Sequence, residues 1–151
     1  MYQEFKNKTV LITGACSGMG LLTAYNFAEL GANVVMLDVN EDKLKEESKA
    51  LCEKGYSVIG LLCNVRNYGD IKNAVDTAKE KFGSVDYTIS YAGGFPGRMC
   101  NDHKPFFERS LETLEWGIDV NFRAPMYMVH AAFPYMKEQK SGVIINIVSI
   151  D

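Results

Sequence analysis

A glycine-rich turn near the amino terminus, residues 13–20, constrains the fold of this chain more than any other stretch. It follows a short apolar run, residues 9–12, and precedes a segment of helical character that ends at Gly31. Glycine permits a tight turn and lets a diphosphate approach main-chain N–H groups, while a helix start adds unpaired donors and a positive dipole end. The stretch therefore favours phosphate binding, although an ordinary strand–helix turn can also contain three glycines.

Strands and helices are predicted to alternate along the rest of the chain. Apolar runs predict further strands at residues 33–38, 56–62, 85–91 and 143–148. Helical patterns predict helices at residues 40–54, around 71–82 and at about 110–137, with a polar loop at 95–107. Because the strands are apolar on both faces, this alternation predicts one doubly wound α/β domain over residues 1–151, with a parallel sheet between two layers of helices.

Ligands of such sheets bind at the carboxyl ends of the strands. The residues predicted at those ends are Gly14, Asp38, Asn64, Gly93 and Ser149. All are glycines or short polar residues, as an edge that contacts a ligand requires.

The composition argues against several classes of function. The chain has 47% hydrophobic and 23% charged residues, which is typical of a soluble protein with a substantial core. A net charge of −3 with scattered Lys and Arg argues against a nucleic-acid partner, and no apolar run has membrane-spanning length. The polar start lacks the apolar stretch of a secretion signal. The four cysteines, which show no metal-ligand spacing, are Cys16, Cys52, Cys63 and Cys100. A cytoplasmic protein with reduced thiols and no metal site is expected.

Asp38 closes the second predicted strand, downstream of the glycine turn. A carboxylate there can accept two hydrogen bonds from an adenosine ribose, and it would repel a 2′-phosphate. No Arg or Lys stands at residues 16, 17, 39 or 40 to offset that repulsion. Asp38 therefore predicts NAD rather than NADP as the cofactor, the alternative being a solvated strand end.

Other polar residues have two interpretations each. The amide of Asn64 could hydrogen-bond an adenine edge or form a turn, and Ser149 could bind a substrate carbonyl oxygen or be a turn residue. Pro125 lacks an N–H, so the carbonyl of Asn121 loses its helical partner, which predicts a kink. The kink either serves packing alone or leaves a carbonyl able to hold a water or a cation. His103 and His130 lack partners arranged for nucleophilic catalysis.

The chain resembles the short-chain dehydrogenase/reductase family over its whole length. Residues 13–20 match that family's motif Thr-Gly-x-x-x-Gly-x-Gly, and Asp38 stands where NAD-preferring members carry their acid. Asn64 and Val65 match the adenine-contact pair, which is more often Asp-Val. The residues of the turn assigned to the cofactor are Thr13, Gly14, Cys16, Ser17, Gly18, Met19 and Gly20.

Three later positions extend the resemblance. Ala92 and Gly93 match the end of the family's Asn-Asn-Ala-Gly motif, whose two asparagines are replaced here by Ser90 and Tyr91. The resemblance assigns Ala92 and Gly93 to the cofactor as well. Asn121 matches the asparagine of the catalytic tetrad. In Asn-Ile-Val-Ser at residues 146–149, the serine matches the catalytic serine.

The resemblance implies a Rossmann fold and an NAD(H)-dependent oxidoreductase that interconverts an alcohol and a carbonyl by hydride transfer. Ser149 would orient the substrate oxygen, and the Asn121 carbonyl would hold a proton-relay water. The family's Tyr-x-x-x-Lys follows the serine, beyond residue 151, and Tyr91 has no Lys partner that would make it a substitute. We therefore expect an amino-terminal portion of a longer enzyme that lacks the last strands of the fold, binds dinucleotide and turns over little.

The partners expected are a small-molecule alcohol or carbonyl and, from the resemblance, further copies of the chain. The apolar strand at residues 143–148 would form a sheet edge, which another chain, copy or complementary segment should cover. Two other functions stay open at this point. One is a dinucleotide sensor without catalysis, and the other is an S-adenosylmethionine-dependent methyltransferase, against which the glycine spacing argues.

Overall fold

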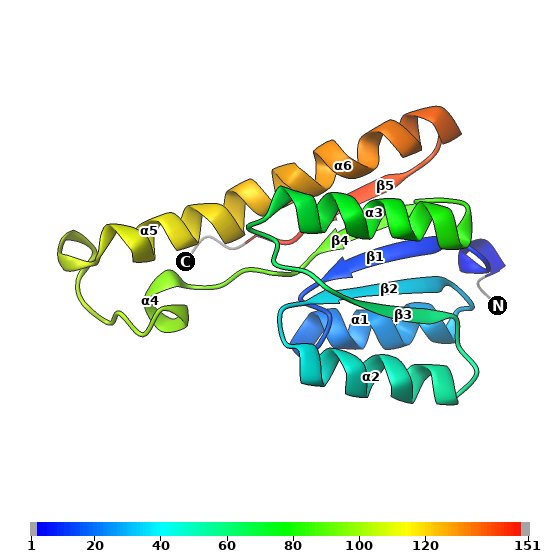
Figure 1. Cartoon of the computed structure of the whole chain (residues 1–151), viewed down its shortest axis with the longest axis horizontal. Helices are drawn as coiled ribbons and strands as arrows, with labels where there is room; N and C mark the ends of the chain where they lie inside the picture. The colour runs from blue at the N-terminus through cyan, green and yellow to red at the C-terminus, as the bar shows by residue number, and fades with distance from the viewer. Residues whose placement is uncertain (1–2, 149–151) are drawn as a thin grey trace.

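Five parallel strands form the centre of the fold in the order β3-β2-β1-β4-β5 (Figure 1). The computed structural model describes residues 3–148. The strands are β1 (Thr9–Thr13), β2 (Asn33–Asp38), β3 (Val58–Leu62), β4 (Tyr87–Ser90) and β5 (Val143–Asn146). The chain builds outward from β1 to β3 on one side and from β4 to β5 on the other, so the order reverses between β1 and β4. Ligands of doubly wound sheets bind at this reversal.

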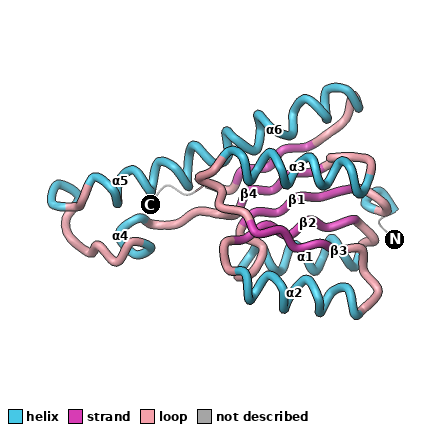
Figure 2. The backbone as a smooth tube through the Cα atoms, in the orientation of Figure 1, coloured by secondary structure: helices cyan, strands magenta, loops and turns pink. Residues whose placement is uncertain are grey.

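Helices cover both faces of the sheet. They are α1 (Gly18–Glu29), α2 (Glu41–Glu53), α3 (Tyr68–Phe82), α4 (Pro96–Met99), α5 (Leu111–Ile118) and α6 (Ala124–Gln139). Figure 2 shows α1 and α2 below the sheet and α3 and α6 above it, while α4 and α5 extend beyond the strands to the left. The doubly wound parallel sheet predicted from the sequence is confirmed. In the part of the chain that is described, no helix has the length and apolar character needed to cross a membrane.

Two apolar cores lie on opposite faces of the sheet, because neighbouring residues of a strand point to opposite sides. Leu11 of β1 packs toward α3 and α6, whereas Val10 and Ile12 pack toward α1 and α2. All three side chains are completely buried. The pattern explains why β1 and β2 read as continuous apolar runs in the sequence: both of their faces are covered.

The structure corrects several predicted boundaries. The helix predicted at 110–137 is three successive segments, α5, the π-helical turn η3 (Asp119–Arg123) and α6, so a wider turn directly precedes the segment that contains Pro125. The loop predicted at 95–107 contains α4 and leads into the 3-10 turn η2 (Phe106–Glu108). A further 3-10 turn, η1 (Gln3–Phe5), precedes β1.

The two edge strands, β3 and β5, are less buried than the three central strands, and Leu62 of β3 is 58% exposed. Val143, Ile145 and Ile147 are between 40% and 46% exposed, so the helices cover β5 incompletely. The expectation that both faces of every strand are covered therefore fails at β5. Ile144 alternates with these residues and packs against the core beneath α6.

The amino-terminal ends of β1 and β4 are joined by a buried carboxylate, Asp86. It accepts hydrogen bonds from the Thr9 N–H at 2.9 Å and the Ser84 hydroxyl at 2.5 Å, and it pairs with Lys8 at 3.1 Å. Burial alone would raise the pKa of Asp86, but these partners outweigh it and lower the pKa below its ordinary value of 3.8. The ionised form is therefore the one that stabilises the fold.

We predict that Asp86→Asn lowers the free energy of unfolding by about 2 kcal/mol at pH 7, because a buried charged acceptor loses its partners. A carboxylate whose pKa is lower in the folded than in the unfolded chain stabilises the folded state at pH values above its unfolded pKa. This stabilisation is lost as the pH falls through the folded pKa. The difference in the free energy of unfolding between wild type and variant, measured by urea unfolding, should therefore shrink below about pH 4. Glu53→Gln is the control, since Glu53 is exposed and pairs only loosely with Lys49. A difference that persists unchanged at pH 2 would contradict this account.

Candidate functional site

The carboxyl ends of β1 and β4 are held together around the glycine turn. Thr13 accepts a hydrogen bond at its hydroxyl from the Ala92 N–H at 3.1 Å and at its carbonyl from the Tyr91 N–H at 3.3 Å. A Cβ on Gly14, whose φ is +66°, would lie 3.0 Å from the nitrogen of Ala92. The absence of a side chain at Gly14 therefore lets the two strand ends approach at the point where the strand order reverses.

The amino terminus of α1 differs from those of α2, α3 and α5. Asn40, Asn67 and Ser110 each accept a hydrogen bond from the first turn of α2, α3 and α5, and each of those turns contains an acidic residue. Ser17 makes no such bond at α1, and no acidic residue lies in the first turn of α1. The first N–H groups of α1 are thus without a side-chain cap at the reversal point, as an anion site requires.

The glycines of this turn have distinct roles. A Cβ on Gly20 would overlap the carbonyl oxygen of Gly14, so Gly20 is needed for α1 to pack against the turn. Gly18 has a φ of +50°, and a Cβ there would meet nothing within 4 Å. The space above Gly18 is therefore open, beside the uncapped start of α1. The residues present fit a dinucleotide diphosphate.

Asp38 lies at the end of β2, directly against the glycine turn. Its carboxylate accepts hydrogen bonds from the N–H of Cys16 and the N–H of Asn40, both at 3.0 Å. Burial, together with the nearby charge of Asp38, raises the pKa of the Cys16 thiol to about 12. Cys16 is therefore neutral at physiological pH and adds no negative charge beside the anion site.

A cavity of about 220 Å³ opens at the ends of β1, β2 and β3. The predicted cofactor residues that line it are Gly14, Asp38, Asn64, Val65, Ala92 and Gly93. The Asn64 oxygen accepts a hydrogen bond from the Arg66 N–H at 3.1 Å, so Asn64 does form a turn, and its amide N–H groups remain as further donors. The lining also contains Met99 and Trp116, which the sequence analysis did not single out.

A second cavity, of about 590 Å³, lies on the other side of Ala92 and Gly93, at the ends of β4 and β5. Its lining includes Met19, Asn121 and Pro125. The Asn121 side chain donates to the Gly94 carbonyl and accepts from the Gly94 N–H, both at 2.9 Å. Asn121 thus fixes the segment that follows β4, and Pro125, which has no N–H, cannot bond the Asn121 carbonyl. Ser149, the predicted catalytic serine, lies outside the described residues.

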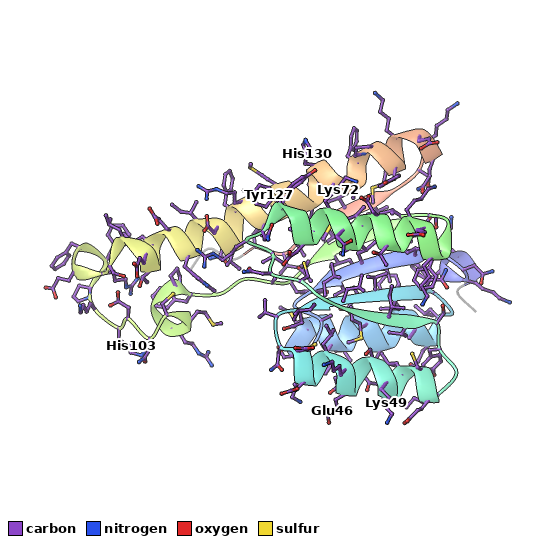
Figure 3. The ribbon with its side chains drawn as sticks, in the orientation of Figure 1. Glu46, Lys49, Lys72, His103, Tyr127 and His130 are labelled. Carbon is purple, nitrogen blue, oxygen red and sulfur yellow. The ribbon has the colours of Figure 1, made fainter. Side chains whose placement is uncertain are left out.

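Two tyrosines and one histidine that could donate a proton are hydrogen-bonded to other side chains. The Tyr91 hydroxyl in the second cavity pairs with the Thr23 hydroxyl at 2.9 Å, and the Tyr135 hydroxyl donates to Asp76, which raises the pKa of Tyr135. Figure 3 shows His103 in the loop beyond α4 and His130 on α6, where it pairs with Tyr68 at 2.8 Å. Tyr135, His103 and His130 lie outside the lining of the second cavity, and the hydroxyl of Tyr91, which lines it, is paired with Thr23.

Comparisons with known proteins agree with this architecture. The family described as short chain dehydrogenase matches residues 8–151. The "CLA biosynthesis dehydrogenase/reductase" of Lactiplantibacillus plantarum is 31% identical over 150 residues, which are 98% of this chain and 50% of that protein. The "Oxidoreductase UcpA" of Escherichia coli strain K12 is 32% identical over 149 residues, 97% of this chain and 53% of that protein.

A solved structure shows the same fold. The crystal structure of gox2181 superimposes with a TM-score of 0.86 at 26% sequence identity, covering 99% of this chain and 57% of that one. The chain thus spans about half the length of the proteins that it matches. From the family match and the parallel sheet with its glycine turn, we conclude that the chain belongs to the short-chain dehydrogenase/reductase family.

Proposed function

We propose that this chain forms the dinucleotide-binding part of an NAD(H)-dependent oxidoreductase that interconverts an alcohol and a carbonyl. One observation carries the proposal: two cavities flank the reversal point and share Ala92 and Gly93, with the uncapped start of α1 beside them. A dinucleotide has two ends joined by a diphosphate. Each end can occupy one of the two cavities while the diphosphate lies at the start of α1. The nicotinamide, when bound, would supply or accept the hydride.

The residues of the chain have separate tasks in this proposal. The N–H groups at the start of α1 bind the diphosphate, and Asp38 accepts hydrogen bonds from the adenosine ribose. Asn64 and Val65 bind the adenine, and Asn121 positions the strand end beside the nicotinamide and holds a water at its carbonyl. Ser149 orients the substrate oxygen. The preference for NAD rests on Asp38, which would lie close to a 2′-phosphate.

We also propose that β5 is covered in the assembled protein by another copy, another chain or a complementary segment. The exposed apolar side chains of Val143, Ile145 and Ile147 support this, because a bare apolar edge strand promotes aggregation. Sedimentation velocity at several protein concentrations tests the case of a second copy, which predicts a species larger than one chain.

Calorimetric titration of the chain with NAD+ and NADP+ tests the coenzyme assignment. We expect one NAD+ per chain and at least about tenfold weaker binding of NADP+, since repulsion between a phosphate and the neighbouring Asp38 carboxylate costs more than about 1.4 kcal/mol. Equal or tighter binding of NADP+ would overturn the preference for NAD. If neither dinucleotide binds at millimolar concentration, the proposed function itself is wrong.

A further inference from the structure

The cavity beside Asp38 has a wall that does not come from the sheet. Met99 of α4 and Trp116 of α5 line it together with the strand-end residues. Figure 1 shows both helices beyond the ends of the strands, as a lobe that extends away from the sheet. This lobe, residues 95–118, therefore contributes side chains to a site that otherwise consists of strand ends and the turns that follow them.

Close packing between α4 and α5 brings Trp116 beside this wall's other members. A Cβ on the neighbouring Gly117 would overlap the ring of Pro96, so α5 lies directly against the start of α4. A Cβ on Gly94 would lie 3.0 Å from the Met99 side chain and 3.9 Å from the Trp116 ring. Both side chains thus lie beside Gly94, in the segment that follows β4.

An ion pair ties the far end of α5 to the same cavity. Arg66, which also lines the cavity, donates from Nη2 and Nε to Asp119 at 2.9 and 3.1 Å. The Asp119 side chain is only 15% exposed and also pairs with Arg123. The lobe is therefore held against the turn after β3 on one side and against the segment after β4 on the other.

The lining of the cavity matches the chemistry of a purine base. A flat aromatic heterocycle is bound by aromatic and polarisable groups on its faces and by hydrogen-bonding groups at its edge. Trp116 and Met99 supply the first kind of group and Asn64 the second. We propose that Trp116 and Met99 pack against the adenine of the dinucleotide, so that the α4–α5 lobe is part of the coenzyme site; this inference rests on the proposed function.

Tryptophan fluorescence tests the inference directly, because Trp116 is the single tryptophan of the chain. Titration with AMP and with NAD+ should change its emission. Trp116→Leu should bind both ligands about tenfold more weakly, as expected for loss of one base–aromatic contact, whereas Trp116→Phe should keep most of the affinity. Leu111→Ala is the control on the same helix, since Leu111 is 75% exposed and lies outside the cavity lining.

The outcomes separate this inference from the proposed function. If NAD+ binds the wild type without any change in emission, and the leucine variant binds it as tightly, the lobe does not contact the base. If Trp116→Leu fails to fold by circular dichroism, the wild-type titration and Met99→Ala carry the test, and unchanged emission with unchanged Met99→Ala affinity overturns the inference. If NAD+ does not bind the wild type at all, both this inference and the proposed function are wrong.

Discussion

Replacing Gly20 with alanine is expected to lower the free energy of unfolding by about 3 kcal/mol and to abolish dinucleotide binding. A Cβ at this position would overlap the Gly14 carbonyl oxygen and come within 2.8 Å of the carbonyl carbon. Backbone atoms cannot rotate away as a side chain can, so α1 would have to move off the turn. The N–H groups at its start would then no longer point to the space above Gly18.

Gly18→Ala is the matched variant for this prediction. The added Cβ meets no atom within 4 Å, so its cost comes only from the left-handed φ of +50°, about 1 kcal/mol. Urea unfolding should therefore place the Gly20 variant well below the Gly18 variant in stability. If the alanine at residue 20 is tolerated as well as the alanine at residue 18, the close contact between α1 and the turn is not a requirement of the fold.

Asp38→Ala is expected to weaken NAD+ binding about a hundredfold, because hydrogen bonds from a ribose to a charged acceptor are each worth about 1.5–3 kcal/mol. The carboxylate already accepts from Cys16 and Asn40, but its two oxygens can accept about four hydrogen bonds in all. The variant should also lose most of its discrimination against NADP+, since the repelling charge is gone. Calorimetry with both dinucleotides measures the two effects together.

Asp42→Ala provides the comparison for Asp38. Asp42 is an exposed carboxylate in the first turn of α2, away from both cavity linings. Its removal should leave the affinities for NAD+ and NADP+ within about twofold of wild type, since an exposed charge outside the site is screened by solvent and salt. Equal losses in the two variants would mean that Asp38 acts through general electrostatics or stability, and not through the ribose.

The sequence was most informative where a local physical requirement selects particular residues. The glycine spacing of residues 13–20 and the apolar runs of the strands follow from turn geometry and burial, and they predicted the parallel sheet. The glycine spacing and Asp38 at the end of β2 also place the proposed site at the carboxyl edge of that sheet. Helix limits were also well predicted where a cap is visible. Asn40 caps α2, and Gly83 ends α3 with a φ of +80°, both as the sequence indicates.

Features that depend on long-range packing were not predicted. Trp116 lines the cavity in a helix that packs against α4 through the contact of Gly117 with Pro96. These two residues are separated by 20 others, and no local sequence pattern connects them. The proline at the start of α4 is a usable signal, since proline is favoured in the first turn of a helix, although the polar residues of this segment predict a loop. Strand β5 ends at Asn146 because its partner β4 has only four residues to pair with it.

The central claim is that a dinucleotide lies across the carboxyl edge of the sheet with its diphosphate at the start of α1. Mapping backbone amide chemical shifts of the chain during titration with NAD+ tests it most directly. The account predicts that the largest shifts occur at the amides of Gly18, Met19 and Gly20, with further shifts at Ala92 and Gly93. Saturable binding that leaves those amides unchanged, and shifts residues of α6 or β5 instead, would contradict it.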